Sequence, residues 1–208
     1  MQQRVPRNLA QLWRLANNPD NNLGQDQVGP SPQKITQACA IKVLREMGVD
    51  DKSHFLDLGS GHGLVCFAAL MEFDVAVSIG IEQAMERTVW GAGTRDLMKL
   101  SPDRLELLTR DITDDNTDVL KDITHIYSFD FDFPEKTVCK AVATIVYNQS
   151  NTLKVFASAH DLVEWRAIAP LAHMHFWDHN VTQREQKVRV KLCGSGARHT
   201  IYLMDIRS

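Results

Sequence analysis

Short apolar runs alternate with amphipathic segments over most of the chain, and this pattern predicts the order of its elements. A segment beginning near residue 34 has apolar positions at helical spacing and ends at Gly48. The strand-like apolar runs that follow cover residues 54–58, 75–81, 105–109, 125–129 and 153–157. Strands that alternate with helical segments indicate an α/β fold, with a mostly parallel sheet covered by helices on both faces.

The pattern changes after residue 170, where apolar runs follow one another without a helix between them. The runs "KVRVKLC" (187–193) and "HTIYLMDI" (199–206) are separated by the turn-like "GSG". Two strands joined by a short turn form an antiparallel hairpin. We therefore predict a Rossmann-like sheet of seven strands that is closed by a C-terminal antiparallel hairpin.

The first 33 residues differ from the rest of the chain. A short helical piece, "NLAQLWRLA", precedes "NNPDNNLGQDQVGPSPQ", which is rich in Asn, Asp, Gly and Pro. Loops of this length in compact domains are usually lids, binding loops or disordered. The predicted organisation is an N-terminal arm and lid loop over residues 1–33 and one domain over residues 34–208.

Composition and charge narrow the class of protein. Of 208 residues, 44% are hydrophobic and 24% charged, and the formal net charge is −3, which is unlike a polycation that binds nucleic acid. No apolar run approaches the ~18 residues of a membrane span, and no secretory signal is evident. The four cysteines form no CxxC pair, which fits a reducing compartment. We expect a soluble intracellular protein.

The segment "FLDLGSGHGLV" carries the most specific chemistry. Gly59, Gly61 and Gly63 directly follow an apolar strand, and glycine permits a tight turn and a close approach by a ligand. A dinucleotide-binding loop needs a small residue where Leu64 stands. With Asp57 the segment reads D-x-G-x-G-x-G, which resembles the opening motif of class I methyltransferases. The resemblance implies that S-adenosylmethionine binds here, with Asp57 accepting from its ammonium group.

Two further acids follow the next two predicted strands. Glu82 lies where an acid can bind ribose hydroxyls, and Asp111 is suited to accept from an adenine amine, with Ile112 against the ring. Each acid alone is equally typical of a helix cap or a solvated strand end. Acids at the tips of three consecutive strands favour a single site. The predicted cofactor-binding residues are Asp57, Gly59, Ser60, Gly61, Gly63, Glu82, Gln83, Asp111 and Ile112.

The predicted fourth strand runs into "HIYSFDFDFPEKT", at the position where methyltransferases select the acceptor. The Pro-Pro-aromatic motif of amino-directed nucleic-acid enzymes is absent here, as is the double-Glu hairpin of arginine methyltransferases. Over residues 28–208 the chain instead resembles the non-SET histone-lysine methyltransferases of the disruptor-of-telomeric-silencing (Dot-one) family. The segments that carry the resemblance are "VGPSPQKIT", "FLDLGSGHGLV", "GIE", "RDI", "FDFDFPE" and "GSGARHTIYLMDIRS".

This resemblance implies a protein-lysine N-methyltransferase that acts on a histone in the nucleosome. The protein would then be nuclear, or cytoplasmic if its substrate is not a histone. The catalytic residues implied are Phe131 and Phe133, as an apolar channel that disfavours the ammonium form of lysine, and Asp130, which would orient the nitrogen. The asparagines of the family motif are replaced here by Phe129 and Asp130, which leaves the identity of the substrate open.

Several alternatives remain open at this stage. The three phenylalanines are also typical of core aromatics at strand spacing. The chain could be an RNA or small-molecule methyltransferase, with His160 or His173 as the base for oxygen methylation. It could also be a methyltransferase-like subunit that binds cofactor or a partner without catalysis.

Charged and metal-binding residue types give weaker signals. The acids between residues 111 and 135 either attract a basic protein such as a histone or are simply solvated. The basic residues of the last 25 positions, together with those of the arm, indicate a modest patch for nucleosomal DNA. "HMHFWDH" places His173 and His175 on one strand face, but complementary ligands are not evident, so we predict no metal site.

Overall fold

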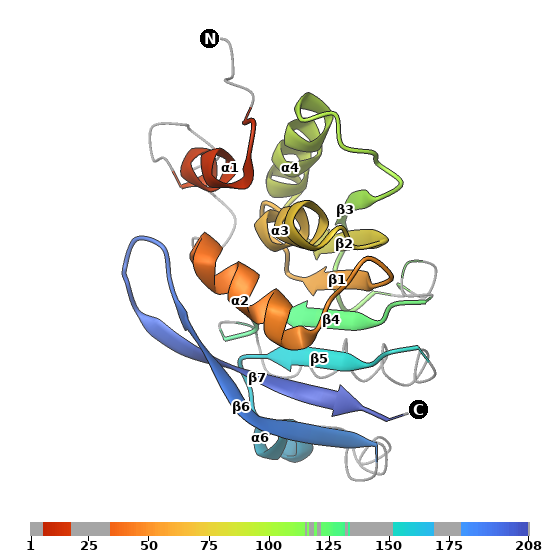
Figure 1. Cartoon of the computed structure of the whole chain (residues 1–208), viewed down its shortest axis with the longest axis vertical. Coiled ribbons are helices and arrows are strands. Elements are labelled where there is room, and N and C mark those ends of the chain that lie inside the picture. Colours follow the sequence, from red (N-terminus) through yellow and green to blue (C-terminus); the bar gives the residue numbers. More distant parts are fainter. Residues whose placement is uncertain are drawn as a thin grey trace.

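The structure is a computed structural model that describes residues 6–17, 34–114, 116, 119, 122–131, 133, 152–168 and 180–207. Its centre is a seven-stranded sheet with the order β3-β2-β1-β4-β5-β7-β6 (Figure 1). The strands are β1 (His54–Leu58), β2 (Val77–Glu82), β3 (Leu105–Thr109), β4 (His125–Ser128), β5 (Val155–Ser158), β6 (Val181–Lys191) and β7 (Arg198–Ile206). Strands β1 to β5 are parallel, and β7 is antiparallel to both of its neighbours. The predicted α/β fold with a C-terminal antiparallel hairpin is confirmed.

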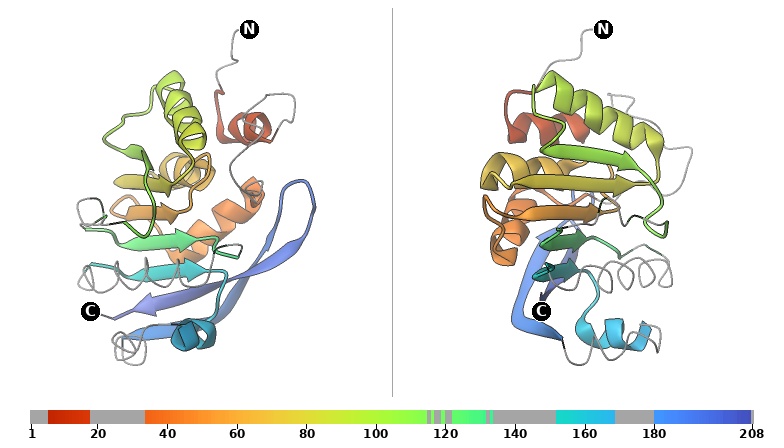
Figure 2. Two further views of the ribbon diagram at one scale, coloured as in Figure 1. Left: turned by 180° about the vertical axis from the view of Figure 1, so that it is seen from behind. Right: turned by 90° about the vertical axis from the view of Figure 1, so that its right-hand side faces the viewer.

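Helices cover both faces of the sheet. The described helices are α1 (Leu9–Ala16), α2 (Gln37–Met47), α3 (Leu64–Phe73), α4 (Met85–Leu97) and α6 (Leu162–Ile168). Helices α1, α2 and α3 lie against one face and α6 against the other (Figure 2). Each face has its own hydrophobic cluster, because successive strand residues point to opposite sides. None of the described helices combines the length and apolar character needed to cross a bilayer.

Helix α2 shows how local sequence sets an element's limits. The Thr36 hydroxyl accepts a hydrogen bond from the Cys39 amide at 3.4 Å, which caps the first turn. Gly48 ends the helix with a φ of 78°, a left-handed conformation that glycine adopts without strain. The helix end predicted at Gly48 is confirmed.

The N-terminal helix α1 is part of the main hydrophobic core. Its buried residues are Leu9, Leu12, Trp13 and Ala16. The Trp13 indole Nε1 donates to the Ile35 carbonyl at 3.1 Å, and the Lys34 ammonium donates to the Ala16 carbonyl at 2.8 Å. These two hydrogen bonds join α1 to the segment that leads into α2.

The outer strand β6 is longer than its apolar pattern predicts. It begins at Val181 rather than at residue 187, and its pairing with β7 shifts register between Gln183 and Lys187. The Arg184 guanidinium forms a fork with the Asp205 carboxylate, with Nε at 3.0 Å and a terminal nitrogen at 2.6 Å. Polar residues form this end of the strand because it lies at the sheet edge, so hydropathy alone could not identify it.

Candidate functional site

The glycine-rich loop turns at the carboxyl end of β1. Gly59, Gly61 and Gly63 all have positive φ angles, of 77°, 56° and 76°. The amides of Gly59 and Ser60 both donate to the Ile81 carbonyl, at 2.9 and 3.0 Å, which anchors the loop to β2. Residues with a side chain adopt these angles only with strain, so the sequence of three alternating glycines is needed for this turn.

Neighbouring side chains pack directly onto these glycines. A Cβ atom added to Gly59 would overlap the ring of Phe133, and one added to Gly63 would lie 2.8 Å from the methyl groups of Leu107. A Cβ added to Gly91 on α4 would likewise overlap Leu107 and come within 3.0 Å of the His62 carbonyl oxygen. The loop is therefore held from both sides by close contacts that only glycine allows.

Glu82 holds the glycine loop from the tip of β2. One carboxylate oxygen accepts from the Gly61 amide and the other from the Ala84 amide, both at 2.9 Å. The Arg87 guanidinium lies 3.5 Å from the same carboxylate, which is 5% exposed. Glu82 thus fixes the loop conformation, in addition to the ligand-binding role predicted from the sequence.

We expect Glu82→Ala to destabilise the protein by about 2 kcal/mol, because it leaves two buried amide donors unsatisfied. Denaturant unfolding measures the change. Glu106→Ala is the matched control, since Glu106 is an exposed acid on neighbouring β3, and it should change stability by less than about 0.5 kcal/mol. Equal effects of the two substitutions would contradict the anchoring role.

Asp57 and Ser60 place polar atoms in buried positions beside the loop. Asp57 is 3% exposed, and burial, followed by the nearby Glu82 carboxylate, raises the pKa of Asp57 to about 8. The Ser60 hydroxyl is also buried and has no hydrogen-bond partner among the described residues. A buried carboxyl of raised pKa and a buried hydroxyl without a hydrogen-bond partner are typical of a site that binds a polar ligand.

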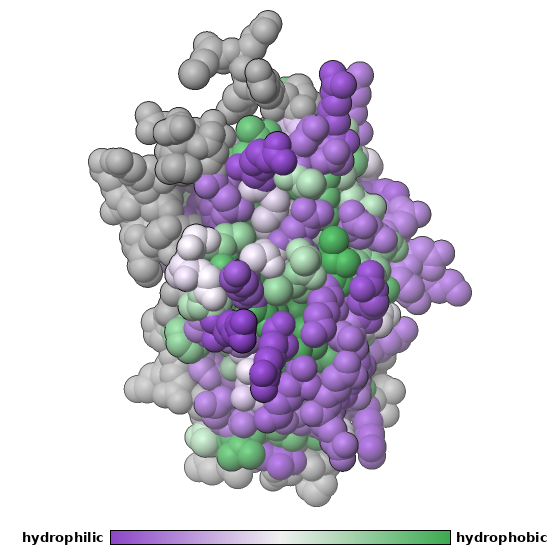
Figure 3. Space-filling model, turned by 60° about the vertical axis from the view of Figure 1, so that its left-hand side comes forward, coloured by the Kyte–Doolittle hydropathy of each residue, from purple (hydrophilic) through white to green (hydrophobic). Residues whose placement is uncertain are grey.

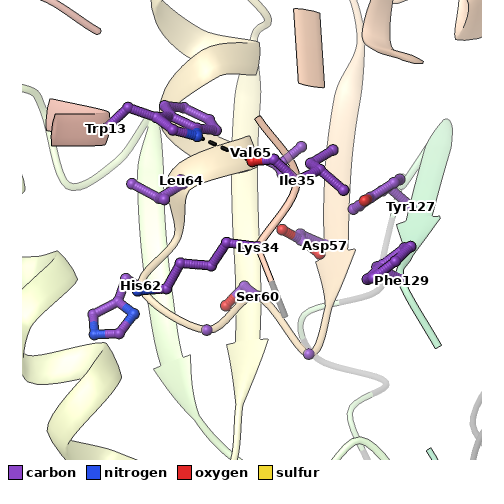
Figure 4. Close-up of a pocket in the computed structure, with 12 residues that line it drawn as sticks. Trp13, Lys34, Ile35, Asp57, Ser60, His62, Leu64, Val65, Tyr127 and Phe129 are labelled. Atoms are coloured by element: carbon purple, nitrogen blue, oxygen red, sulfur yellow. Dashed lines mark hydrogen bonds between the residues drawn. The ribbon is translucent and has the colours of Figure 1, made fainter. Parts of the chain in front are cut away.

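Both residues line a cavity of about 470 Å³, a volume that includes its open mouth. Its walls come from α1, the segment before α2, the β1–α3 loop and β4 (Figure 4). The lining residues are Trp13, Lys34, Ile35, Asp57, Gly59, Ser60, Gly61, His62, Leu64, Val65, Tyr127 and Phe129. The cavity is therefore a mainly apolar pocket whose wall carries one carboxyl, that of Asp57, and one ammonium group, that of Lys34, which suits a ligand with an apolar body and a zwitterionic end.

Asp130 lies in the loop after β4 and points into the protein. One of its oxygens accepts from the Ser158 hydroxyl at 2.8 Å and the other from the Ala159 amide at 2.9 Å. Burial raises the pKa of Asp130 to about 6. Asp130 thus ties the end of β4 to the end of β5.

Phe131 and Phe133 contact different parts of the protein. Phe131 is 52% exposed, and its ring centroid lies 4.3 Å from that of His199 on β7, whereas Phe133 covers Gly59. Phe129, which lines the cavity, also contacts His199, at 5.5 Å between centroids. Because β4 ends at Ser128, the alternation of a strand does not extend over these residues.

Comparison with solved structures decides the fold family. Magnesium protoporphyrin IX methyltransferase from Synechocystis PCC 6803, solved with bound S-adenosylmethionine, superposes with a TM-score of 0.59 at 10% identity, over 96% of this chain and 97% of that one. A candidate tRNA (m1A22) methyltransferase of Streptococcus pneumoniae superposes with a TM-score of 0.58 at 10% identity, over 84% and 72%. The chain has the class I methyltransferase fold.

A third solved structure and one protein family also match this chain. TrmN from Thermus thermophilus superposes with a TM-score of 0.60 at 10% identity, over 80% of this chain, which spans only 48% of TrmN. The family described as "Histone methylation protein DOT1" matches residues 34–99. No relative was found among curated proteins. The matched residues run from the segment before α2 to the end of α4, so they include the glycine loop and Glu82 but neither the Asp130 loop nor the hairpin.

Five of the nine residues predicted at the cofactor site do not line the cavity: Gly63, Glu82, Gln83, Asp111 and Ile112. Asp111 is exposed after β3, and its carboxylate accepts from the Thr113 amide and hydroxyl, both at 2.8 Å. Ile112 packs against the hydrophobic cluster on the α6 side of the sheet, and Gln83 is exposed between β2 and α4. The structure brings Asp57, the glycines, Ser60 and Glu82 together as one unit.

Trp13, Lys34 and Ile35 line the cavity but were not predicted as site residues. Trp13 lies on α1, and Lys34 and Ile35 lie in the segment before α2 that is hydrogen-bonded to α1; the amphipathic pattern of "NLAQLWRLA" was the signal that this arm packs against the domain. His173 and His175 and the lid-loop residues 18–33 lie outside the described residues. Among those that are described, no group of three potential metal ligands is present.

Proposed function

We propose that the protein is an S-adenosylmethionine-dependent methyltransferase that binds this cofactor in the Asp57 cavity. The observation that carries the proposal is the buried Asp57 carboxyl beside the glycine loop. The sulfonium and the ammonium group of the cofactor are cationic, and a cation favours the ionised carboxylate that burial disfavours. The Ser60 hydroxyl, which has no hydrogen-bond partner among the described residues, supplies a further polar partner for the amino-acid end.

The residues around the cavity act by positioning. Bound S-adenosylmethionine supplies an electrophilic methyl group, and attack on it depends on alignment more than on a strong base. Tyr127 and Phe129 contribute apolar walls that exclude water, and Glu82 keeps the loop in shape. Asp130 is a positioning residue, because both of its oxygens are bound to β5 and its loop carries Phe129 and Phe131.

For the acceptor, RNA or a small molecule is the first candidate. Superposition with an RNA-directed and a porphyrin-directed enzyme supports it, and so does the exposed Phe131, since a planar acceptor can stack on this ring. A histone lysine is the second candidate, favoured by the DOT1 match over residues 34–99. In that case the Asp130 carboxylate, which is fully buried, would have to become accessible before it could orient the lysine nitrogen, and the protein would act in the nucleus.

Transfer of labelled methyl groups tests the proposal. Total RNA, a metabolite extract, nucleosomes and free core histones are incubated side by side with protein and labelled S-adenosylmethionine, and cofactor binding is measured separately by calorimetry. We expect micromolar binding, with label on RNA or a metabolite. Label on a histone lysine would assign the second acceptor, and the absence of cofactor binding would overturn the proposed function.

The substitution Phe131→Ala tests whether the exposed Phe131 ring, which contacts His199, takes part in methyl transfer. We expect at least a tenfold loss of methyl transfer with the cofactor affinity within twofold of the wild type, because Phe131 does not line the cavity. Val163→Ala, at a position 71% exposed on α6, is the control and should leave both unchanged. Parallel loss of turnover and cofactor affinity in Phe131→Ala would contradict an acceptor role.

A further inference from the structure

The β6–β7 hairpin has one apolar and one basic face. Its buried side carries Val188, Val190 and Ile201, which join the hydrophobic cluster next to α2. Strand residues alternate between faces, so their neighbours point to the opposite side. That side carries four exposed cations, here called the basic face: Lys187, Arg189, Lys191 and Arg198.

The basic face lacks compensating acids. Lys191 stands directly opposite Arg198 in the strand register, and like charges in that arrangement are unfavourable. No ion pair links any of the four cations to a carboxylate within the described part of the chain, whereas Arg184 on the same strand is forked onto Asp205. Four uncompensated cations on a chain of net charge −3 indicate a surface that binds an anionic partner.

Aromatic rings accompany these cations. The Lys187 ammonium lies 5.0 Å from the centre of the Tyr202 ring, its cross-strand neighbour. Arg198 is followed by His199, which points to the other face and contacts Phe131 as well as Phe129, and Phe129 lines the cavity. Cations that contact the backbone, together with nearby aromatic rings on which bases stack, are the features with which proteins bind unpaired nucleic-acid strands.

The position of the hairpin connects this surface to the site. Its turn lies at the sheet edge where the parallel strands end (Figure 1), on a side of the molecule with extensive hydrophilic surface (Figure 3). The basic face and the Phe131–His199 rim are on opposite faces of the hairpin but one residue apart along β7. A ligand that contacts both must bend around the hairpin. A flexible single strand can do so, whereas a duplex is stiff over about 150 base pairs.

We propose that the basic face binds the phosphates of a single-stranded RNA segment and that an unpaired base of this segment stacks at the Phe131–His199 rim. Cations two residues apart along a strand are spaced by ~7 Å, so each can contact a separate phosphate. Binding of RNA depends on the hairpin alone, while methylation of the stacked base rests on the function proposed above.

Fluorescence anisotropy with a labelled 20-nucleotide single-stranded RNA of mixed sequence tests the binding step. The test variant replaces Lys187, Arg189, Lys191 and Arg198 by glutamine. The control variant replaces four other exposed cations by glutamine. They lie on α2 and before β1 and β5: Lys42, Arg45, Lys52 and Lys154. Each variant loses four positive charges, so both have a formal net charge of −7, obtained from −3. Calorimetry with S-adenosylmethionine shows that each variant retains a folded cofactor site.

We expect the test variant to bind RNA at least thirtyfold more weakly than the control variant. The slope of log K against log salt should fall by about 3, since each phosphate contact contributes ~0.7 for single strands. Tyr202→Leu and Phe131→Leu should each weaken binding about tenfold without changing this slope. Equal losses in the two four-residue variants would overturn the proposal, as would tighter binding of nucleosomes or duplex DNA than of RNA. If the wild-type protein does not bind S-adenosylmethionine, only the function proposed above is overturned.

Discussion

Replacing Asp57 by asparagine is expected to weaken S-adenosylmethionine binding about a hundredfold at pH 7.5 and to have little effect at pH 5.5. In the free protein the pKa of Asp57 is raised to about 8 by burial. Binding of a cation therefore requires loss of a proton, which costs about 1.4 kcal/mol for each pH unit below this pKa. The wild-type affinity should rise nearly tenfold per pH unit from 5.5 to 7.5, where the cofactor's own ammonium remains protonated. The affinity of the variant should stay flat.

Calorimetry across this pH range provides the measurement, and stability provides the control. A carboxyl whose pKa is higher in the folded than in the unfolded state adds stability at low pH that is lost as the pH rises from about 4 to 8. Asp57→Asn removes this dependence, so the variant should be at least as stable as the wild type at pH 7.5. A flat wild-type affinity profile would show that Asp57 does not meet the cationic part of the cofactor.

Replacing Gly59 by alanine is expected to reduce cofactor affinity more than a hundredfold and to destabilise the protein by about 3 kcal/mol. The left-handed backbone accounts for about 1 kcal/mol of this loss. The remainder follows from the overlap of the new methyl group with the Phe133 ring, which must be displaced. Gly59 itself lines the cavity, so the backbone shift that relieves this overlap is expected to lower cofactor affinity.

The substitution Gly48→Ala separates the effect of the left-handed backbone from the effect of the overlap with Phe133. Gly48 has nearly the same φ, 78°, but no atom lies within 4 Å of the position of its Cβ. This variant should lose about 1 kcal/mol of stability and bind the cofactor as the wild type does. In Gly59→Ala/Phe133→Leu the smaller side chain should restore part of the stability. Similar stability losses in Gly48→Ala and Gly59→Ala would contradict close packing of Phe133 on the loop.

The fold and the centre of the site could be predicted from the sequence because both depend on local patterns. The apolar runs of β1 to β5 alternate with helical segments, and Asp57 and the three glycines are close in sequence. Glu82 was found by its distance from the loop. Its bonds to the Gly61 and Ala84 amides could not be predicted, because they depend on how β2 ends next to β1.

The remaining features depend on contacts between distant segments. The direction of Asp130 is set by Ser158 and Ala159 at the end of β5, and no local pattern encodes that pairing. The channel of Phe131 and Phe133 was implied by the family resemblance and stays a prediction; in the structure β4 ends at Ser128, and the two rings contact His199 and Gly59. The polar start of β6 was missed for a similar reason, since its stability comes from Arg184 and Asp205 across the hairpin.

The place of β7 in the sheet has a consequence for the order of folding. β7 follows every other strand in the sequence, yet it lies between β5 and β6. During synthesis the first five strands become available long before residues 198–206, so until then β5 presents an unpaired edge open to intermolecular pairing. The contacts of His199 with Phe129 and Phe131 also form at this last step. A nascent chain therefore acquires the glycine loop early and the contacts of His199 with Phe129 and Phe131, where we propose that the acceptor binds, only when the sheet closes.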